Sequence, residues 1–439
     1  MEDKDIKDVI DKESLAIPSS FSQRIDDTLS ALPSKKTKRR NPIIFGAIAA
    51  IVLLMGVSAT VSDTFADTIK NIPFLGAIFE EIGDSGLNQA SKQGLATEVN
   101  ETISTKNISI TITDVIFDGT RLSIAYVKQS NEEFAPDYMN HFVEDLDIFI
   151  DGKLLHNLGM GIRAEQLDDH TIAGVVDINT EESLKESFTL TLKMREIDEE
   201  KGNWKISIPI QKIGDGKTIL LHDQKEFNNT TWKLVKATLT PATTKISFNT
   251  ILPIDAVENN DWDISYQLLD DKGIQVRPLS GHASGSPLDD NMWINKSSAV
   301  FAPVSHASDY LIFQAIMRPL KEAPFSVVEA SLQNNLPIEL EQGDVGKLVL
   351  TKMEYTETET LVYFTVYGSD PYRQTTLWFV DQNGNTYRSD DVPEKLSEEV
   401  YNFVVTFPLL PSLEQLTAVT VELAPPKVIE ELRFKIPIK

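Results

Sequence analysis

Residues 111–126 have the sequence TITDVIFDGTRLSIAY, in which two apolar segments flank Asp118-Gly119. Apolar and polar side chains alternate before this turn, at residues 108–112, and after it, at residues 122–126. A period of two residues is typical of a β-strand with one buried face, and Asp-Gly is a common turn between paired strands. The segment therefore predicts two antiparallel strands joined by a tight turn.

The same pattern occurs twice more along the chain, in KLVKATLTPATTKISFN (233–249) and LVLTKMEYTETETLVYFT (348–365). Each pair precedes a strand with a hairpin turn, an apolar late strand and a proline-containing strand. Any all-β chain shows loose similarity among its strands, but the matched order of features favours true repeats. The turns contain Asp151-Gly152, Gly273 and Asn383-Gly384; the late strands are 187–194, 310–317 and 401–409; the proline-containing strands are 206–210, 336–340 and 434–438.

We therefore expect a mainly β protein with three immunoglobulin-like β-sandwich domains, at residues 101–212, 213–341 and 342–439. Short alternating strands separated by turn signals are typical of that architecture. The 439 residues include no cysteine, so packing alone must hold each sandwich together. The absence of cysteine also excludes thiolate metal sites and a cysteine nucleophile.

The segment 42–61, PIIFGAIAAIVLLMGVSATV, has no charged residue. Twenty residues of helix span about 30 Å, which is the thickness of the hydrocarbon core of a bilayer. Five basic residues lie at 35–40, directly before the run, and acidic residues follow it. Because basic residues collect on the cytoplasmic side, we expect a single-pass transmembrane helix with a cytoplasmic N-terminus.

A cleaved signal peptide is the alternative for this run, and Val57 and Ala59 form the small-x-small pattern of a cleavage site. About 40 residues precede the run, however, and it exceeds the 7–15 residues of a signal-peptide core. A buried core helix is a poorer explanation, since such a helix usually has a polar face. The sequence therefore favours a retained anchor at the cell membrane, with the C-terminal domains extracellular.

The net charge of −25 belongs to the expected outer part of the chain. Residues 62–439 carry 32 Lys and Arg against 58 Asp and Glu, whereas residues 1–41 are almost balanced. This acidity argues against nucleic-acid binding, which needs a basic surface. Exported proteins without cysteine are common in Gram-positive bacteria, and we expect that cell envelope. Residues 62–100 contain two apolar stripes of helical period and predict a juxtamembrane helical stalk.

The expected cytoplasmic segment, residues 1–41, contains one clear helical stripe. Phe21, Ile25, Leu29 and Leu32 recur at helical spacing, after Ser20, which is positioned to cap a helix. Such a short helix is marginal alone in water. The stripe either packs within a small hairpin at the membrane or binds a partner inside the cell, and the second interpretation makes these four residues the candidate partner-binding site.

No pattern in the sequence predicts a catalytic, cofactor or metal site. The six histidines form no helical metal-binding pair, and residues 281–286, GHASGS, lack the serine that a nucleophile elbow requires. Asp381 begins a sequence similar to a calcium loop, but its glycine and final glutamate are misplaced. Acidic loops at Asp289 and Asp263 are explained by solvation. We therefore expect no enzyme activity and no cofactor.

The chain resembles a family of Gram-positive single-pass membrane proteins known as a domain of unknown function. The likeness is carried by Leu32-Pro33-Ser34-Lys35, by DTFADTIKNIPFLGAIFEEIG (63–83) and by the strand pair around Asp118–Leu122. The middle repeat resembles a companion domain of unknown function. Because the family tends to be encoded beside extracytoplasmic-function sigma factors, the resemblance implies an anti-sigma-factor-like regulator. Many anti-sigma factors have a zinc-binding His and Cys motif, so binding without cysteine must be metal-free.

These observations give two functional hypotheses. In the first, a membrane-anchored regulator senses or binds an envelope ligand outside and holds a sigma factor inside. In the second, an envelope adhesion or ligand-binding protein uses its inner segment only to set topology. The first needs the apolar stripe intact, whereas the second needs only charge and length there.

Overall fold

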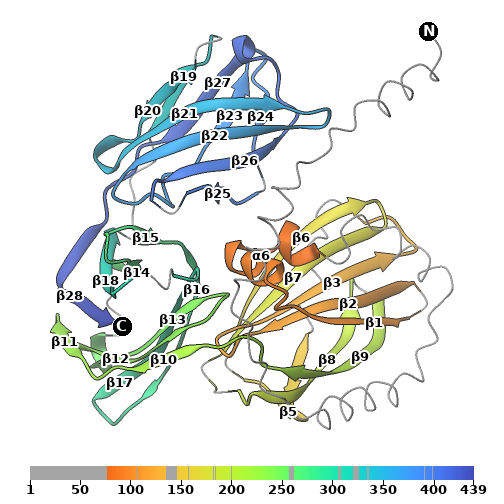
Figure 1. Ribbon diagram of the computed structural model, residues 1–439, viewed down its shortest axis with the longest axis vertical. Helices are drawn as coiled ribbons and strands as arrows, with labels where there is room; N and C mark the ends of the chain where they lie inside the picture. The colour runs from red at the N-terminus through yellow and green to blue at the C-terminus, as the bar shows by residue number, and fades with distance from the viewer. Residues whose placement is uncertain are drawn as a thin grey trace, which may run out of the picture. The chain divides into compact units, whose positions relative to one another are not determined.

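The computed structural model describes residues 77–439, apart from 106, 135–145, 157, 181, 183, 199, 257–261, 305–307, 320–325, 334–335, 390 and 398. The expected cytoplasmic segment, the apolar run 42–61 and the stalk up to residue 76 lie outside the described residues. Within the described part, antiparallel strands form six sheets that pack in pairs around three separate cores (Figure 1). The expectation of a mainly β protein built from sandwiches is confirmed.

The first sandwich consists of sheet A, in the order β1-β2-β3-β7-β6, and sheet B, in the order β5-β4-β8-β9. Its core lies between the sheets and includes Tyr126 and the fully buried Trp204. The strands of sheet A are β1 Thr97–Ser104, β2 Ile108–Phe117, β3 Leu122–Ser130, β6 Leu158–Asp168 and β7 Thr171–Thr180. Those of sheet B are β4 Asp147–Ile150, β5 Lys153–Leu154, β8 Ser187–Ile197 and β9 Glu200–Gln211.

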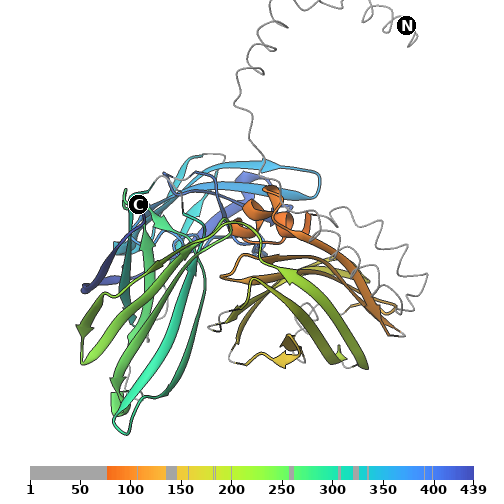
Figure 2. The ribbon, with the colours of Figure 1, turned by 60° about the horizontal axis from the view of Figure 1, so that its bottom comes forward.

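Two short helices cover the outer face of sheet A. The helices α5 (Ile78–Glu81) and α6 (Ser85–Lys92) lie against β3 and β7 in both ribbon views (Figures 1 and 2). Ile78, Phe79 and Leu87 of this helix pair pack onto Ala125 and Val175 of the sheet. As a result β2 and β7 are buried along their whole length, on both faces. The expected stalk thus contains helices, and they rest on the first sandwich.

The second sandwich consists of sheet C, in which β10-β12-β13-β17-β16 are joined by β11, and sheet D, in the order β15-β14-β18-β28. Phe248, Phe313 and Tyr266 meet at its centre, with ring centroids 4.6–5.4 Å apart. The strands are β10 Lys217–Leu220, β11 Gln224–Phe227, β12 Thr230–Leu239, β13 Thr244–Pro253, β14 Trp262–Leu269, β15 Gln275–Val276, β16 Pro278–Pro287, β17 Met292–Phe301, β18 Tyr310–Pro319 and β28 Lys427–Pro437. A 3₁₀ turn, η3, covers Ile254–Ala256.

The third sandwich consists of β19-β27-β23-β24 and β20-β21-β22-β26-β25. Phe364, Phe379, Phe403 and Phe407 are among its fully buried core residues. The strands are β19 Val327–Ser331, β20 Ile338–Glu341, β21 Gly346–Tyr355, β22 Glu359–Gly368, β23 Trp378–Asp381, β24 Thr386–Tyr387, β25 Glu394–Lys395, β26 Asn402–Pro408 and β27 Leu416–Val421. The 3₁₀ turns η4 and η5 cover Gly343–Val345 and Leu413–Gln415.

The chain order of the last two sandwiches differs from the expected tandem repeats. Strand β28, which the repeat pattern places in the third domain, pairs with β18 and buries Leu432 and Phe434 in the second core. Strand β20, which the pattern places in the second domain, pairs with β21 of the third sandwich. The third sandwich is therefore inserted between β18 and β28. Alternation reveals a buried strand face but does not identify the sheet that the strand joins.

The predicted strand pairs and glycine turns are otherwise confirmed. The pairs β2–β3, β12–β13 and β21–β22 are antiparallel hairpins, as the three repeated sequence segments predict. Gly152, Gly273 and Gly384 have positive φ in the turns after β4, β14 and β23. Residues 281–286, which lack the serine of a nucleophile elbow, belong to β16, an edge strand of sheet C.

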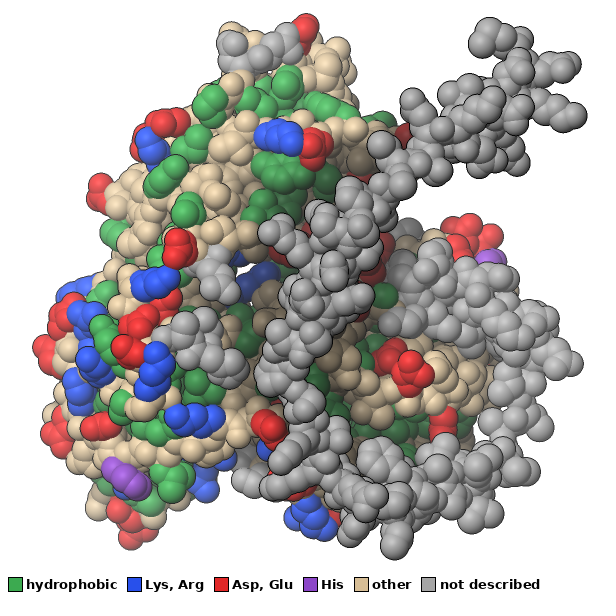
Figure 3. All heavy atoms as spheres, in the orientation of Figure 1, with side chains coloured by type: hydrophobic (Ala, Val, Ile, Leu, Met, Phe, Trp, Pro, Cys, Tyr) green, Lys and Arg blue, Asp and Glu red, His purple; other side chains and the backbone are tan. Residues whose placement is uncertain are grey.

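Figure 3 shows acidic, basic and apolar side chains interspersed on the visible face. Many of the exposed large apolar side chains lie in the third sandwich and its loops: Val327, Tyr355, Tyr367, Val392, Leu396, Val400 and Leu409. No helix of the described residues is long and apolar enough to cross a membrane.

The return of β28 predicts which core a C-terminal substitution will damage. Replacing Phe434 with Ala should destabilise the second sandwich by about 3–5 kcal/mol, because the buried ring leaves a cavity. Hydrogen exchange should accelerate at amides of β14 and β18 and stay unchanged in β21 and β22. Glu431→Ala, on the exposed side of the same strand, is the control. Faster exchange confined to the third sandwich would contradict the insertion.

Candidate functional site: a buried polar junction

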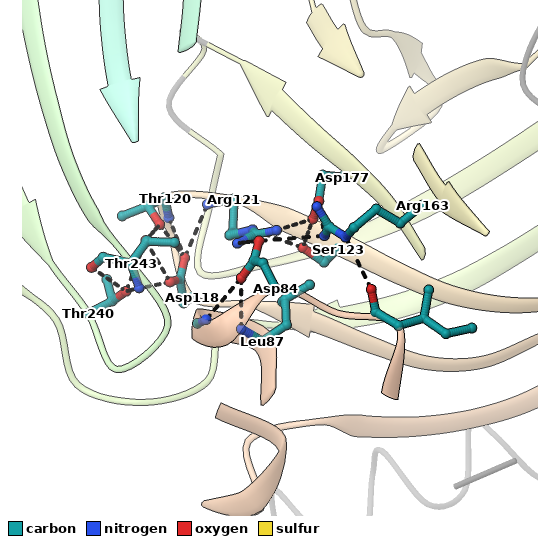
Figure 4. Close-up of polar contacts among 12 residues, drawn as sticks. Asp84, Leu87, Asp118, Thr120, Arg121, Ser123, Arg163, Asp177, Thr240 and Thr243 are labelled. Carbon is teal, nitrogen blue, oxygen red and sulfur yellow. Dashed lines mark hydrogen bonds and ion pairs between the residues drawn. The ribbon is translucent and has the colours of Figure 1, made fainter. Parts of the chain in front are cut away.

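The outer face of sheet A carries charged side chains at a point where it is fully covered. Arg121, Ser123 and Asp177 lie beside the apolar residues that the helix pair covers, and all three are nearly inaccessible to solvent. Asp84, Arg163 and the β2–β3 turn complete the group, together with two threonines of the second sandwich (Figure 4). We call these residues, Asp84, Asp118, Thr120, Arg121, Ser123, Arg163, Asp177, Thr240 and Thr243, the polar junction.

Asp84 joins helix α6 to the sheet. Its Oδ1 accepts hydrogen bonds from the backbone N–H groups of Gly86 at 2.9 Å and Leu87 at 3.1 Å, so it caps the helix N-terminus. Its Oδ2 lies 2.8 Å from Arg121 Nη1 and 3.5 Å from Arg163 Nη2. One carboxylate therefore caps the helix and binds it to the β2–β3 turn and to β6.

Asp177, on β7, holds the same two guanidinium groups from the other side. Its Oδ1 pairs with Arg121 and accepts from Ser123 Oγ at 2.5 Å, while its Oδ2 lies 2.5 Å from Arg163 Nη2. Arg163 also donates from Nε to the carbonyl oxygen of Ile82, at 3.2 Å. Two carboxylates and two guanidinium groups thus alternate across the β2–β3 turn, β7, β6 and the start of α6.

Asp118, in the β2–β3 turn, joins the first sandwich to the second. Its Oδ1 accepts from the N–H of Thr120 at 2.7 Å and the N–H of Arg121 at 3.1 Å. Its Oδ2 accepts from the hydroxyls of Thr240 and, at 3.1 Å, Thr243, in the β12–β13 turn. The Thr120 hydroxyl also bonds to the Thr243 hydroxyl.

Close backbone contact reinforces this attachment. Gly86 of α6 packs against the β12–β13 turn so tightly that a Cβ atom would lie 2.1 Å from the carbonyl oxygen of Ala242. Ala242 itself is buried in the cluster formed by the helix pair and sheet A. Glycine is therefore required at position 86, and the helix, the sheet and the second sandwich meet at one point.

The chemistry of the junction is that of a satisfied buried network. Each of the six oxygens of Asp84, Asp118 and Asp177 has at least one hydrogen-bond donor. Buried ion pairs of this kind add little net stability over apolar packing, but losing one partner costs about 3–5 kcal/mol because it leaves a buried charge. The junction is suited to specifying one arrangement of its parts and to coupling them.

The protonation behaviour of the junction follows from this arrangement. Burial opposes ionisation of Asp177, but Arg121 and Arg163 outweigh it and hold the pKa of the carboxyl below its usual value of 3.8. Burial likewise opposes the charge of Arg121, and the carboxylates of Asp177 and Asp84 outweigh it and raise its pKa. Both groups stay charged throughout the physiological range.

Asp114, on β2, behaves in the opposite way. Burial raises its pKa from 3.8 to about 6; the adjacent Thr113 hydroxyl opposes the rise and the neighbouring Glu98 adds to it. Its native state therefore favours the protonated carboxyl. The resulting stabilisation is complete below pH 3.8 and is lost as the pH rises through about 6.

In the acidic loops that the sequence analysis considered, the aspartate side chains accept hydrogen bonds from backbone N–H groups of the same loop. Asp289 Oδ1 accepts from the N–H groups of Asn291 and Met292, each at 2.9 Å. Asp381 Oδ1 accepts from the N–H groups of Asn383 at 2.8 Å and Asn385 at 2.9 Å in the β23–β24 hairpin. Among the described residues, no group of three or more His, Cys, Asp or Glu is arranged to hold a metal ion.

The four residues predicted to bind a partner, Phe21, Ile25, Leu29 and Leu32, lie outside the described residues. Sequence reasoning identified Asp118–Leu122 only as part of a hairpin and of a family-like segment, and it missed Asp84, Arg163, Asp177, Thr240 and Thr243. A signal was present, since the odd positions Ala173 and Val175 of β7 are as apolar as the even ones. A strand that is apolar on both faces is buried on both, so a charged residue within it needs a buried partner.

Two family models match separate segments of the chain. The model of the Domain of unknown function (DUF4179) matches residues 36–130, and that of the Family of unknown function (DUF5643) matches residues 216–340. Both matches agree with the resemblance to domains of unknown function. Asp84, Asp118, Thr120 and Arg121 lie in the first match, and Thr240 and Thr243 lie in the second. The polar junction thus includes residues of both matched segments, whereas Arg163 and Asp177 lie in neither.

Solved structures that are similar to the chain include the following two. The conserved domain protein from Bacillus anthracis shows 20% identity over 58% of this chain and 87% of that chain, with a TM-score of 0.44. The full ectodomain (Ig1–Ig3) of mouse nectin-like molecule 4 shows 10% identity over 72% of this chain and 92% of that chain, with a TM-score of 0.13. No curated protein matches the chain.

Removing the carboxylate that links the sandwiches should weaken the fold markedly. Asp118→Ala takes the acceptor from two backbone N–H groups and three threonine hydroxyls, and we expect a loss of about 2–4 kcal/mol in the free energy of unfolding. Urea denaturation of the full chain measures this loss. Asp290→Ala, at an exposed acidic position, should change it by less than about 0.5 kcal/mol. Equal stabilities of the two variants would contradict the role of Asp118.

Neutralising Asp114 should have the opposite effect at neutral pH. Asp114→Asn removes a carboxylate whose ionisation the native state disfavours, so stability at pH 7 should rise by about 1 kcal/mol after allowance for solvent screening. The gain should shrink as the pH falls below about 6 and disappear near pH 4. Urea denaturation at several pH values measures it, with Asp169→Asn as the exposed control. A gain independent of pH would show that titration of Asp114 is not its cause.

Proposed function

We propose that the chain is a membrane-anchored, anti-sigma-factor-like regulator of a Gram-positive cell envelope. In this proposal residues 1–41 are cytoplasmic, residues 42–61 span the membrane once, and the sandwiches, immunoglobulin-like in kind, face the outside. The apolar stripe Phe21, Ile25, Leu29 and Leu32 holds a sigma factor without a metal ion. The outer part binds an envelope ligand and has no catalytic role.

The double attachment made by the β2–β3 turn is the observation that carries the proposal. Asp118 binds the second sandwich, and Arg121, three residues later, binds the carboxylate that caps α6. Helix α5 begins at Ile78, only 17 residues after Val61, the last residue of the apolar run. The element that holds the second sandwich therefore also holds the helices next to the proposed membrane span.

This arrangement offers a physical route for a signal. A ligand that favours a different docking of the second sandwich would act on the β12–β13 turn, and hence on Asp118. The ligand can shift the equilibrium between the two docking arrangements only by the difference in its affinity for them. A buried and fully hydrogen-bonded junction is either formed or broken, so the second sandwich has two distinct docked states rather than a continuous range. Movement of Arg121 would then alter the cap of α6 and the segment that leads toward the membrane.

The energetics of the inner stripe fit a regulator that can be released. Burying four apolar side chains stabilises a complex by about 6–12 kcal/mol in total. Ordering a short flexible segment offsets several kcal/mol of that gain. The remainder corresponds to about micromolar binding, which tethering to a membrane strengthens through effective concentration.

Replacing Ile25 and Leu29 with Asp should abolish binding of the sigma factor, because two unpaired charges cannot be buried in an apolar interface. In cells, transcription of the sigma-dependent genes should rise at least several-fold while the protein level in the membrane stays normal. Reporter transcription and membrane immunoblotting measure the two quantities.

Gln23→Asp with Ser30→Asp is the matched control, since these residues lie on the other side of the expected helix. It adds the same charge and should leave transcription repressed. Unchanged transcription in the Ile25 and Leu29 variant, with normal membrane protein, would exclude the regulator. The protein would then be an envelope adhesion or ligand-binding protein whose inner segment only sets topology.

A further inference from the structure

The first and second sandwiches also meet at a second place, where the outer faces of sheets A and C lie against each other. Lys245 Nζ of β13 donates to the carbonyl oxygen of Thr180 on β7, at 3.0 Å. The imidazole of His282 on β16 packs onto Gly159 of β6, where a Cβ atom would lie 3.3 Å from Nδ1. We call this contact the seam.

Three polar side chains form a row across the sheet C side of the seam. Ser247 of β13 lies directly opposite Ser298 of β17, and Ser298 lies directly opposite His282 of β16. Directly opposite residues share a face, so the three side chains point the same way, away from the core residues Ile246 and Ala299. Ser247 is 5% exposed and Ser298 is 4% exposed.

Asn179 brings a fourth polar group from the sheet A side. It lies on β7 directly opposite Gly159, the residue on which His282 packs. It is 5% exposed, and it has the same strand parity as Asp177 and Val175, which face outward from the first core. The row on sheet C and Asn179 therefore approach each other across the seam.

None of these four groups has a hydrogen-bond partner for its buried polar atom among the described residues. Ser247 Oγ, Ser298 Oγ, His282 Nε2 and Asn179 Oδ1 are all buried atoms without a partner there. A buried polar atom left unbonded is destabilising, and four such atoms at one contact would offset a large part of the stability of a domain.

The chemistry of the four atoms identifies their partner. Two hydroxyls that donate and accept, one amide acceptor and one imidazole nitrogen form a neutral, mixed set that lacks the carboxylates a divalent cation prefers. Opposite side chains on paired strands lie about 5 Å apart, which a water molecule with two hydrogen bonds of about 2.8 Å bridges. Buried water typically makes about three such bonds.

We propose that the seam contains an internal water site, in which ordered water bridges Ser247, Ser298, His282 and Asn179. The two contacts between the sandwiches then differ in kind. The polar junction is bonded directly through Asp118, whereas the seam is bonded through solvent. The water site does not depend on the function proposed above, because it rests only on contacts of the described residues.

Thermal unfolding of the full chain tests the water site, because the direction in which the Tm changes depends on whether water is bound. Ser298→Ala removes a partner of the bound water, so the Tm should fall by about 1–4 °C. If the hydroxyl were instead dry and unbonded, its removal would leave the Tm unchanged or raise it, and either result overturns the proposal. Ser286→Ala, an exposed serine on the neighbouring strand β16, is the matched control and should leave the Tm unchanged.

A crystal structure at about 1.5 Å resolution gives the decisive observation. Density for a water molecule within about 3.2 Å of at least two of the four atoms supports the site. Direct protein partners for these atoms, or a seam without water density, would overturn it whatever the thermal result.

Discussion

Burial of β2, β3 and β7 of sheet A on both faces is the constraint on which the rest of the described structure depends. An antiparallel sheet in a sandwich normally keeps one face in water, but here helices α5 and α6 and the second sandwich share the outer face. Any charge on that face must find a partner within the protein. Arg121 and Asp177 do so through each other and through Asp84 and Arg163. The helix cap, the strand pairing and the docking of the second sandwich thus share one set of hydrogen bonds.

The sequence predicted the hairpins and turns, because these depend on residues that are neighbours in the chain. The alternation around Asp118-Gly119 predicted the β2–β3 hairpin, and Asn383-Gly384 predicted the turn after β23. The structure adds a second role for Asp118, since its side chain bonds to threonines about 120 residues away. That role depends on which sandwich docks on which face. Neither propensity nor periodicity encodes such contacts, because both describe a residue only relative to its neighbours in the chain.

The last strand shows the same limit at the scale of a domain. Strand β28 has the apolar alternation of an ordinary sandwich strand, and a tandem arrangement assigns it to the sandwich that precedes it. It instead completes sheet D, beside β18. The choice follows from the fit of Leu432 and Phe434 to a core that already contains Phe313. The candidate site was accessible to sequence reasoning only through the unusual two-sided apolarity of β7, which required charged residues to be paired.

The insertion of the third sandwich also determines the order in which the protein becomes complete during synthesis. Strand β18 ends at Pro319 and its partner β28 begins at Lys427, so the ribosome makes the whole third sandwich before the second can close. At about 5–20 residues per second, this interval lasts from about five to about twenty seconds. Throughout it, one edge of β18 lacks its β28 partner and the second core lacks Phe434. A nascent chain of this kind needs protection from strand-to-strand association until its last residues are made.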